Sequence, residues 1–238
     1  MDRTRVLAAV LSLTAGSADA VGLLGFGLFT AHITGNLAVL AMYVAIGRPA
    51  SLALVLSIPL FIVVVAAARR LTDRWTRRGR PALRPLLWAQ LLLLAGFFGL
   101  IAVGEAVGLA GFEGREVLAG PPTTAGTVTV LLAVAAMAVQ NTLVMIALTG
   151  PPPTTVMTTN LTRFMVAASD LAVRRGDPAA RRPARAQVAR IWPVLVGFLV
   201  GAGLAAAAYA GLGWWSMALP LVLAAVALVV APSGRRPS

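Results

Sequence analysis

T-A-H-I-T-G-N, at residues 30–36, returns in altered form as T-T-V-M-T-T-N at residues 154–160. Each stretch follows an apolar block with a polar group in its interior, Asp19 in the first half and Gln140 with Asn141 in the second. Each is followed by a short amphipathic segment and then by longer apolar blocks. A motif that recurs at corresponding points of two hydropathy patterns indicates an internal duplication.

The rest of the chain is dominated by apolar blocks long enough to cross a bilayer. Of its 238 residues, 59% are hydrophobic and 12% are charged, which is about half the charge of a soluble domain. Six blocks of about twenty residues match the thickness of a hydrocarbon core. These blocks are 6–29, 51–68, 85–104, 127–148, 191–210 and 214–231. We therefore expect an all-α polytopic membrane protein, with residues 1–238 forming a single transmembrane domain.

The distribution of arginine predicts how the chain crosses the membrane. The segment 34–47 would span about 21 Å as a helix, too little to cross, and residues 154–173 contain many polar side chains. If neither segment crosses, six spans result and 17 of the 20 arginines lie on the cytoplasmic side. Seven spans, with only 34–47 crossing, would divide the arginines 15 to 4. The positive-inside rule therefore favours six spans in the cell (inner) membrane, with both termini in the cytoplasm.

Six spans imply an inverted repeat. Each half of the chain contains three spans, an odd number, so the second half enters the membrane upside down relative to the first. Repeat one covers residues 1–105 and repeat two covers 124–232, and each has a short broken or re-entrant helix after its first span. Inverted repeats with broken helices near the midplane are a recurring plan of secondary transporters.

Composition excludes several kinds of chemistry. The chain has no cysteine and His32 is its only histidine, so thiolate nucleophiles and histidine-based zinc sites are excluded. Without lysine there is no Walker-type phosphate loop and no Schiff base. We expect no enzyme activity, no metal and no cofactor. The net charge of +12 lies in short loops between apolar blocks, which favours membrane lipids over nucleic acid as partners.

The residues G-S-A-D-A-V-G-L at 16–23, followed by H-I-T-G-N at 32–36, resemble the YoaK-like family of bacterial membrane proteins, a domain of unknown function. The likeness covers nearly the whole chain, including Q-N at 140–141 and T-T-V-M-T-x-N at 154–160. Thr159 stands where the family more often has glycine, which loosens the idea that both elements bind alike. The resemblance implies membrane location and a shared fold, but neither a substrate nor a mechanism.

Polar residues within or beside the apolar blocks are the candidate binding site. An ionisable group within a span costs about 2.5–3.5 kcal/mol and is usually paired or faces a cavity. Asp19 either couples protons or binds a cation, or else it caps a helix break near Gly16 and Ser17 or pairs with a basic residue purely for structure. Arg163 is a candidate partner of Asp19 or Asp170. Alternatively it contacts substrate, or it lies on a surface helix that faces the headgroups.

Four further candidates have side chains that cap helices and stand where the short helices should begin. They are Thr34, Asn36, Thr158 and Asn160. They either help to bind a ligand at the helix ends or cap their own backbones. His32 either carries a proton or only forms hydrogen bonds. Gln140 and Asn141 either face a shared cavity or join helices.

These features favour a small secondary permease or facilitator for a small polar solute, with protons coupled through Asp19. Two other functions stay open at this stage. Two re-entrant half-helices also suit a channel-like pore, and the basic loops suit docking by a membrane interaction or assembly subunit. The Gly197-x-x-x-Gly201 pattern allows close helix contact either within the chain or in a homodimer.

Overall fold

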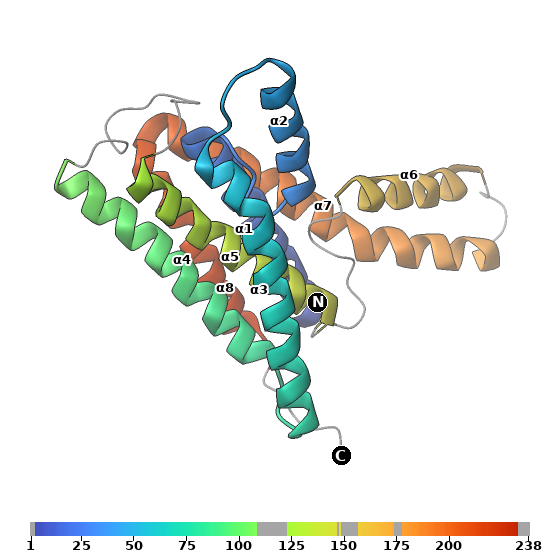
Figure 1. The fold of residues 1–238 in the computed structure, drawn as a ribbon. Coiled ribbons are helices and arrows are strands. Elements are labelled where there is room, and N and C mark those ends of the chain that lie inside the picture. Colours follow the sequence, from blue (N-terminus) through green and yellow to red (C-terminus); the bar gives the residue numbers. More distant parts are fainter. Residues whose placement is uncertain (1–2, 109–122, 147, 149–156, 174–177, 233–238) are drawn as a thin grey trace.

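The computed structural model describes residues 3–108, 123–146, 148, 157–173 and 178–232. Figure 1 shows that these residues form a helical bundle, and no strand occurs among them. The helices are α1 (Arg3–Phe26), α2 (Ile33–Ala45), α3 (Leu52–Arg77), α4 (Leu83–Ala106), α5 (Thr124–Ile146), α6 (Met157–Val173), α7 (Pro178–Leu212), the 3₁₀ helix η1 (Gly213–Met217) and α8 (Ala218–Val230). The all-helical fold expected from the sequence is confirmed.

Five helical stretches within the described residues are long and apolar enough to cross a membrane. Four of them coincide with α1, α3, α4 and α5. The fifth, Arg181–Val230, contains α7, η1 and α8. Within it the chain turns back at η1 (Figure 1), where Gly213 has a positive φ of 57°. These stretches are compatible with a multi-pass membrane protein.

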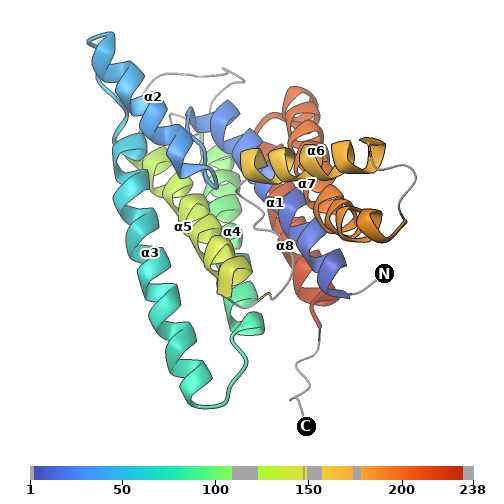
Figure 2. The ribbon, with the colours of Figure 1, turned by 90° about the vertical axis from the view of Figure 1, so that its right-hand side faces the viewer.

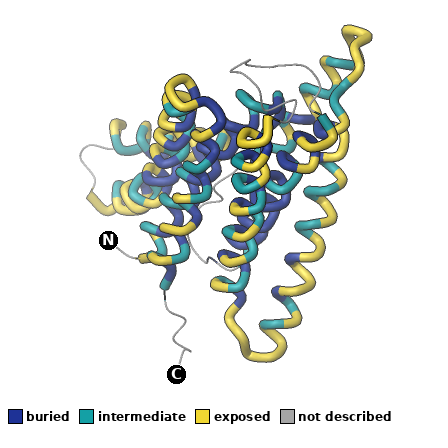
Figure 3. The backbone as a smooth tube through the Cα atoms, turned by 90° about the vertical axis from the view of Figure 1, so that its left-hand side faces the viewer, coloured by how far each residue is buried: buried dark blue, intermediate teal, exposed yellow. Residues whose placement is uncertain are grey.

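The centre of the bundle is formed by α1 and α5. In the most apolar part of α1, 67% of the residues are buried, and the corresponding share is 72% for α5 but only 22% for α3. Figure 3 shows the buried residues in the middle of the bundle and the exposed ones along the outer helices. The outer helices expose large apolar side chains such as Ile62, Leu92 and Leu199. Such an exterior is expected of helices that face lipid tails, which are as apolar as leucine.

The two central helices are packed in a reciprocal way. The main neighbours of α1 are α7 and α8, and those of α5 are α3 and α4. Contacts of α1 with α5 and of α4 with α8 join these two groups. The first long helix of each half of the chain therefore packs mainly on the last two helices of the other half.

Glycines allow α1 and α7 to approach closely. A Cβ atom at Gly16 would lie 2.2 Å from the carbonyl oxygen of Phe198, and one at Gly201 would lie 2.2 Å from that of Leu13. At Gly197 a Cβ would lie 2.8 Å from a carbonyl oxygen of α1. The Gly197-x-x-x-Gly201 motif therefore packs helices within the chain. Since α1 runs unbroken through Gly16, the helix break considered there does not exist, and this glycine serves helix contact.

Both short helices expected after the first long helix of each half are present. α2 has 13 residues and packs on α3, and its only buried residue is Asn36. α6 has 17 residues and packs on α7, and it buries Asn160 and Ala167. Figures 1 and 2 agree that α6 begins near the start of α2. The two motif asparagines are thus the buried polar residues of their short helices.

Candidate functional site

The loop between α1 and α2 folds back along α1. The chain reverses at Gly27, whose φ is +70°, and the N–H of Leu28 donates to the carbonyl of Gly22 over 3.4 Å. A Cβ atom at Gly22 would lie 2.7 Å from the Cγ2 methyl of Thr30. Glycine at position 22 therefore leaves the space through which the loop returns toward the middle of α1.

The carboxylate of Asp19 accepts hydrogen bonds from the backbone of this loop. Its Oδ1 accepts hydrogen bonds from the N–H groups of Thr30 at 2.8 Å, Ala31 at 2.6 Å and His32 at 3.4 Å. Asp19 is only 4% exposed, and a buried carboxylate needs such partners. The three N–H groups directly precede α2, which begins at Ile33. Asp19 therefore holds the entry to α2 and satisfies donors that lipid could not.

The second oxygen of Asp19 pairs with the imidazole of His32, through Nδ1. The ring lies edge-on to Phe198 of α7, with 5.1 Å between the ring centroids. Its other nitrogen, Nε2, has no hydrogen-bond partner within the described part of the chain, and the side chain is 23% exposed. A carboxylate on one ring nitrogen fixes the orientation of an imidazole and leaves the other nitrogen to exchange a proton.

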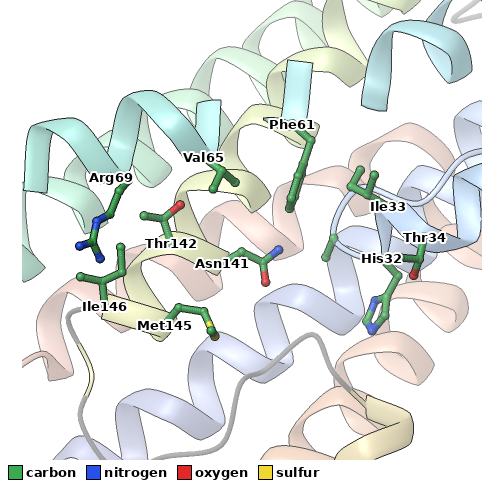
Figure 4. A pocket seen from close by; sticks show the side chains of 11 residues that line it. His32, Ile33, Thr34, Phe61, Val65, Arg69, Asn141, Thr142, Met145 and Ile146 are labelled. Atoms are coloured by element: carbon green, nitrogen blue, oxygen red, sulfur yellow. The ribbon is translucent and has the colours of Figure 1, made fainter. Parts of the chain in front are cut away.

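His32 lines a pocket of about 600 Å³ (Figure 4). The loop and the start of α2 contribute His32 and Thr34, and α5 contributes Asn141 and Thr142. Three residues predicted from the sequence, His32, Thr34 and Asn141, therefore meet at one pocket. Thr142 was not predicted, because a threonine in an apolar block carries little signal.

The opposite wall of the pocket belongs to α3. Phe61, Val65 and Arg69 line it, and their spacing of four residues places them on one face of the helix. Figure 4 shows Arg69 at one end of the pocket and His32 at the other. Arg69 begins the Arg-rich stretch 69–84, so sequence reasoning assigned it to a cytoplasmic loop and missed it.

Asn36 lies outside this pocket and is fully buried. Its Oδ1 accepts a hydrogen bond from the N–H of Phe29 at 2.8 Å, and its Nδ2 donates to the Phe29 carbonyl at 2.8 Å and to the Ser57 hydroxyl at 3.1 Å. A Cβ atom at Gly35 would lie 2.8 Å from the Phe29 ring. Gly35 and Asn36 of the T-G-N motif therefore bind the returning loop to α2 and α3.

Gln140 is also fully buried and joins three helices. Its Nε2 donates to the carbonyl of Leu11 on α1 at 2.9 Å, and its Oε1 accepts from Gln90 of α4 at 2.7 Å. Of the two roles considered for the pair, Gln140 joins helices and Asn141 lines a pocket. Gln90 was not singled out from the sequence, although a lone glutamine within an apolar block is a signal for such a contact.

Thr158, Asn160 and Arg163 lie on α6, outside the described lining of this pocket. Thr158 and Arg163 are exposed and Asn160 is buried. The Arg163 carbonyl accepts a hydrogen bond from Gln187 of α7 at 3.4 Å. In the described part of the chain Asp19 is paired with His32 rather than with Arg163, because the returning loop brings the imidazole directly to the carboxylate.

Comparison with protein families assigns the chain to a family. The family described as protein of unknown function (DUF1275) matches residues 7–230. The chain belongs to this family. The resemblance to YoaK-like proteins is thereby confirmed, because these are DUF1275 members. No match was found among curated proteins or among solved structures.

In this DUF1275 chain the described residues include no group of three or more His, Asp or Glu side chains that could hold a metal ion. The arrangement offers a different chemistry. One imidazole is anchored by a buried carboxylate and exposed to a pocket that also presents hydroxyl, amide and guanidinium groups. Such a pocket can bind a small molecule and exchange a proton beside it.

Proposed function

We propose that this protein is a small secondary permease that moves a polar solute together with protons across the cell membrane. The observation that supports it is the Asp19–His32 pair, whose imidazole borders a pocket of about 600 Å³. Proton and solute then share one pocket, so the charge of the ring changes the affinity for the solute. By linkage, the solute changes the affinity for the proton to the same extent, which is the basis of coupled transport.

The surroundings of His32 are suited to this role. Asp19 of α1 is the only acid that contacts the ring among the described residues, and Arg69 of α3 lies across the pocket. α7 contributes the uncharged Phe198, and α5 contributes Asn141. When the ring is protonated, it forms an ion pair with Asp19. The hydrogen bonds from the backbone N–H groups of the loop to Asp19 do not involve the ring.

The same proposal includes six spans arranged as two inverted repeats. The reciprocal packing supports it, since α1 lies on α7 and α8 while α5 lies on α3 and α4. The buried Asn36 of α2 and Asn160 of α6 occupy corresponding positions of the two motifs. The reversal of the chain at the start of η1 allows α7 to form one crossing and η1 together with α8 to form another.

The proposed orientation places both termini in the cytoplasm. α3 has Arg74 and Arg77 in its last turn, and α7 has Arg181 and Arg182 near its start. In an inverted repeat the end of α3 and the start of α7 are on the same side. The positive-inside rule assigns that side to the cytoplasm.

Proton movement itself can test the function while the solute is unidentified. The full chain would be reconstituted into vesicles loaded with the pH-sensitive dye pyranine. Carboxylates, amides, amines and sugars would then be added under an inward proton gradient. Vesicles without protein give the background. We expect saturable acidification with at least one solute, and we expect Asp19→Asn and His32→Gln to lose it. Glu105→Gln, an exposed acid-to-amide change outside the pocket, serves as the matched control and should retain it.

Other outcomes would replace the proposal with one of the two alternatives. Flux that rises linearly with solute concentration and never saturates would overturn the carrier in favour of a channel-like pore. If the folded protein gives no flux above background with any solute of the panel, transport is overturned and a membrane interaction subunit takes its place. Equal flux from Asp19→Asn and the unmodified chain would overturn coupling through the Asp19–His32 pair.

A further inference from the structure

We infer that the solute is a small amphipathic organic anion, a monocarboxylate with an apolar body, and that Arg69 binds its carboxylate. This inference rests on the proposed function, and it assigns the chemical class of the solute to the pocket between α3 and α5. It is based on the charge of the described lining, the free end of Arg69 and the apolar wall beside it.

The charged groups at the pocket are of one sign. Its described lining contains the cation Arg69 and the titratable His32, and contains no aspartate or glutamate. The nearest acid behind His32 is Asp19, whose oxygens are occupied by three N–H groups and by the imidazole. The acid beside Arg69 is Asp73, which lies outside the described lining and accepts from Nε. The described lining therefore offers no carboxylate to a cationic solute, whereas an anion would meet the terminal N–H groups of the guanidinium.

Arg69 is oriented by a neighbour but keeps its binding end available. Its Nε donates to Asp73 at 3.1 Å, one helical turn away, in an exposed ion pair. The terminal amino groups of Arg69 have no hydrogen-bond partner within the described residues. A guanidinium presents its N–H groups as a planar fork that matches a carboxylate with two parallel hydrogen bonds. Asp73 therefore contacts Arg69 at Nε and leaves the terminal N–H groups available.

The wall beside Arg69 accounts for the apolar body. Phe61 and Val65 precede Arg69 on the same face of α3, and Met145 and Ile146 of α5 also line the pocket. An inorganic anion or a sugar has no apolar part that could pack against this surface. A volume of about 600 Å³ lies within the range of pockets that bind small organic molecules. A carboxylate at Arg69 with its hydrocarbon part along Phe61 and Val65 fits both features.

Coupling to a proton follows from the same charges. Binding a monocarboxylate brings one negative charge to Arg69, and protonation of His32 adds one positive charge at the other end of the same pocket. Opposite charges in one pocket attract each other. The anion and the proton therefore favour each other, and their joint movement carries no net charge.

Binding to the purified full chain in lipid nanodiscs tests the inference by isothermal titration calorimetry. The probes are phenylacetate, phenylacetamide and phenethylamine, which share one ring and differ in the head group. Hexanoate, hexanamide and hexylamine form a second set with a flexible body. We expect at least one carboxylate to bind at least tenfold more tightly than its amide, and its amine not to bind. Acetate, which lacks the body, should bind at least tenfold more weakly.

Variants connect the preference to Arg69. Arg69→Gln should equalise the affinities of the carboxylate and the amide. Arg74→Gln, an exposed arginine of the same helix outside the described lining, should leave the preference unchanged. The inference is overturned if no carboxylate is preferred in either set, or if Arg69→Gln retains a tenfold preference.

The two proposals can fail separately. If a carboxylate binds through Arg69 but produces no proton flux in the vesicle assay above, the permease is overturned and the anion site stands. If proton flux occurs with another solute while neither phenylacetate nor hexanoate binds or competes, the anion site is overturned and the permease stands.

Discussion

The side-chain amide of Asn36 forms two hydrogen bonds with the backbone of Phe29, accepting from its N–H and donating to its carbonyl, each over 2.8 Å. In this way an amide on α2 acts toward Phe29 as a neighbouring strand would. A third bond reaches Ser57 of α3 at 3.1 Å. One buried side chain thus joins the returning loop, the short helix and the first outer helix.

Replacing Asn36 by alanine should therefore destabilise the fold. The change removes three hydrogen bonds and leaves the N–H and carbonyl of Phe29 without their partner, which costs about 2–4 kcal/mol. The measurement is the free energy of unfolding of the purified protein in detergent. Thr34→Ala changes an exposed neighbour and should stay within about 0.5 kcal/mol of the unmodified chain. Equal stability of both variants would contradict the structural role of Asn36.

Two glycines of α7 should respond in opposite ways to alanine. At Gly201 a Cβ atom would lie 2.2 Å from the Leu13 carbonyl oxygen, so α1 and α7 must separate. We expect a loss of about 3 kcal/mol from this overpacking. At Gly203 nothing lies within 4 Å, and alanine should stabilise the helix by up to about 1 kcal/mol. Thermal unfolding of the two variants compares them directly, and similar melting temperatures would rule out the close α1–α7 contact.

Gln140 and Asn141 are adjacent in sequence but should differ in function. Gln140→Leu leaves the Leu11 carbonyl and the Gln90 amide without their partner, at a cost of about 1–3 kcal/mol. Asn141→Ala changes a group that lines the pocket, and it should weaken solute-dependent proton flux. Both quantities would be measured for both variants. A reversed pattern would show that the pocket has been misidentified.

The proposed orientation can be measured by labelling, since the chain contains no cysteine. Arg78→Cys and Arg185→Cys place a thiol at the end of α3 and near the start of α7, and both positions are exposed. In intact cells they should resist a membrane-impermeant maleimide, and they should react after the cells are permeabilised. Arg48→Cys, between α2 and α3, should react in intact cells. The opposite labelling would invert the topology.

The sequence by itself determined the long apolar helices and the two short helices, and these are compatible with a multi-pass membrane protein. These are local properties: a block of about twenty apolar residues specifies a spanning helix wherever it stands. The short length of α2 was likewise predictable, because the segment 34–47 has too few residues for a helix of spanning length. The recurrence at 30–36 and 154–160 located both motifs, although residues 154–156 lie outside the described residues.

Only the tertiary structure decided which residues meet. It paired Asp19 with His32, assigned Gly197 and Gly201 to contact within the chain, and added Arg69 to the pocket. Each of these depends on which helices become neighbours. That arrangement depends on the short loop that returns along α1, and on glycines that allow the backbones of α1 and α7 to come into contact. Hydropathy and charge counts indicate whether a helix prefers lipid or water. They carry no information about which face of one helix packs on another.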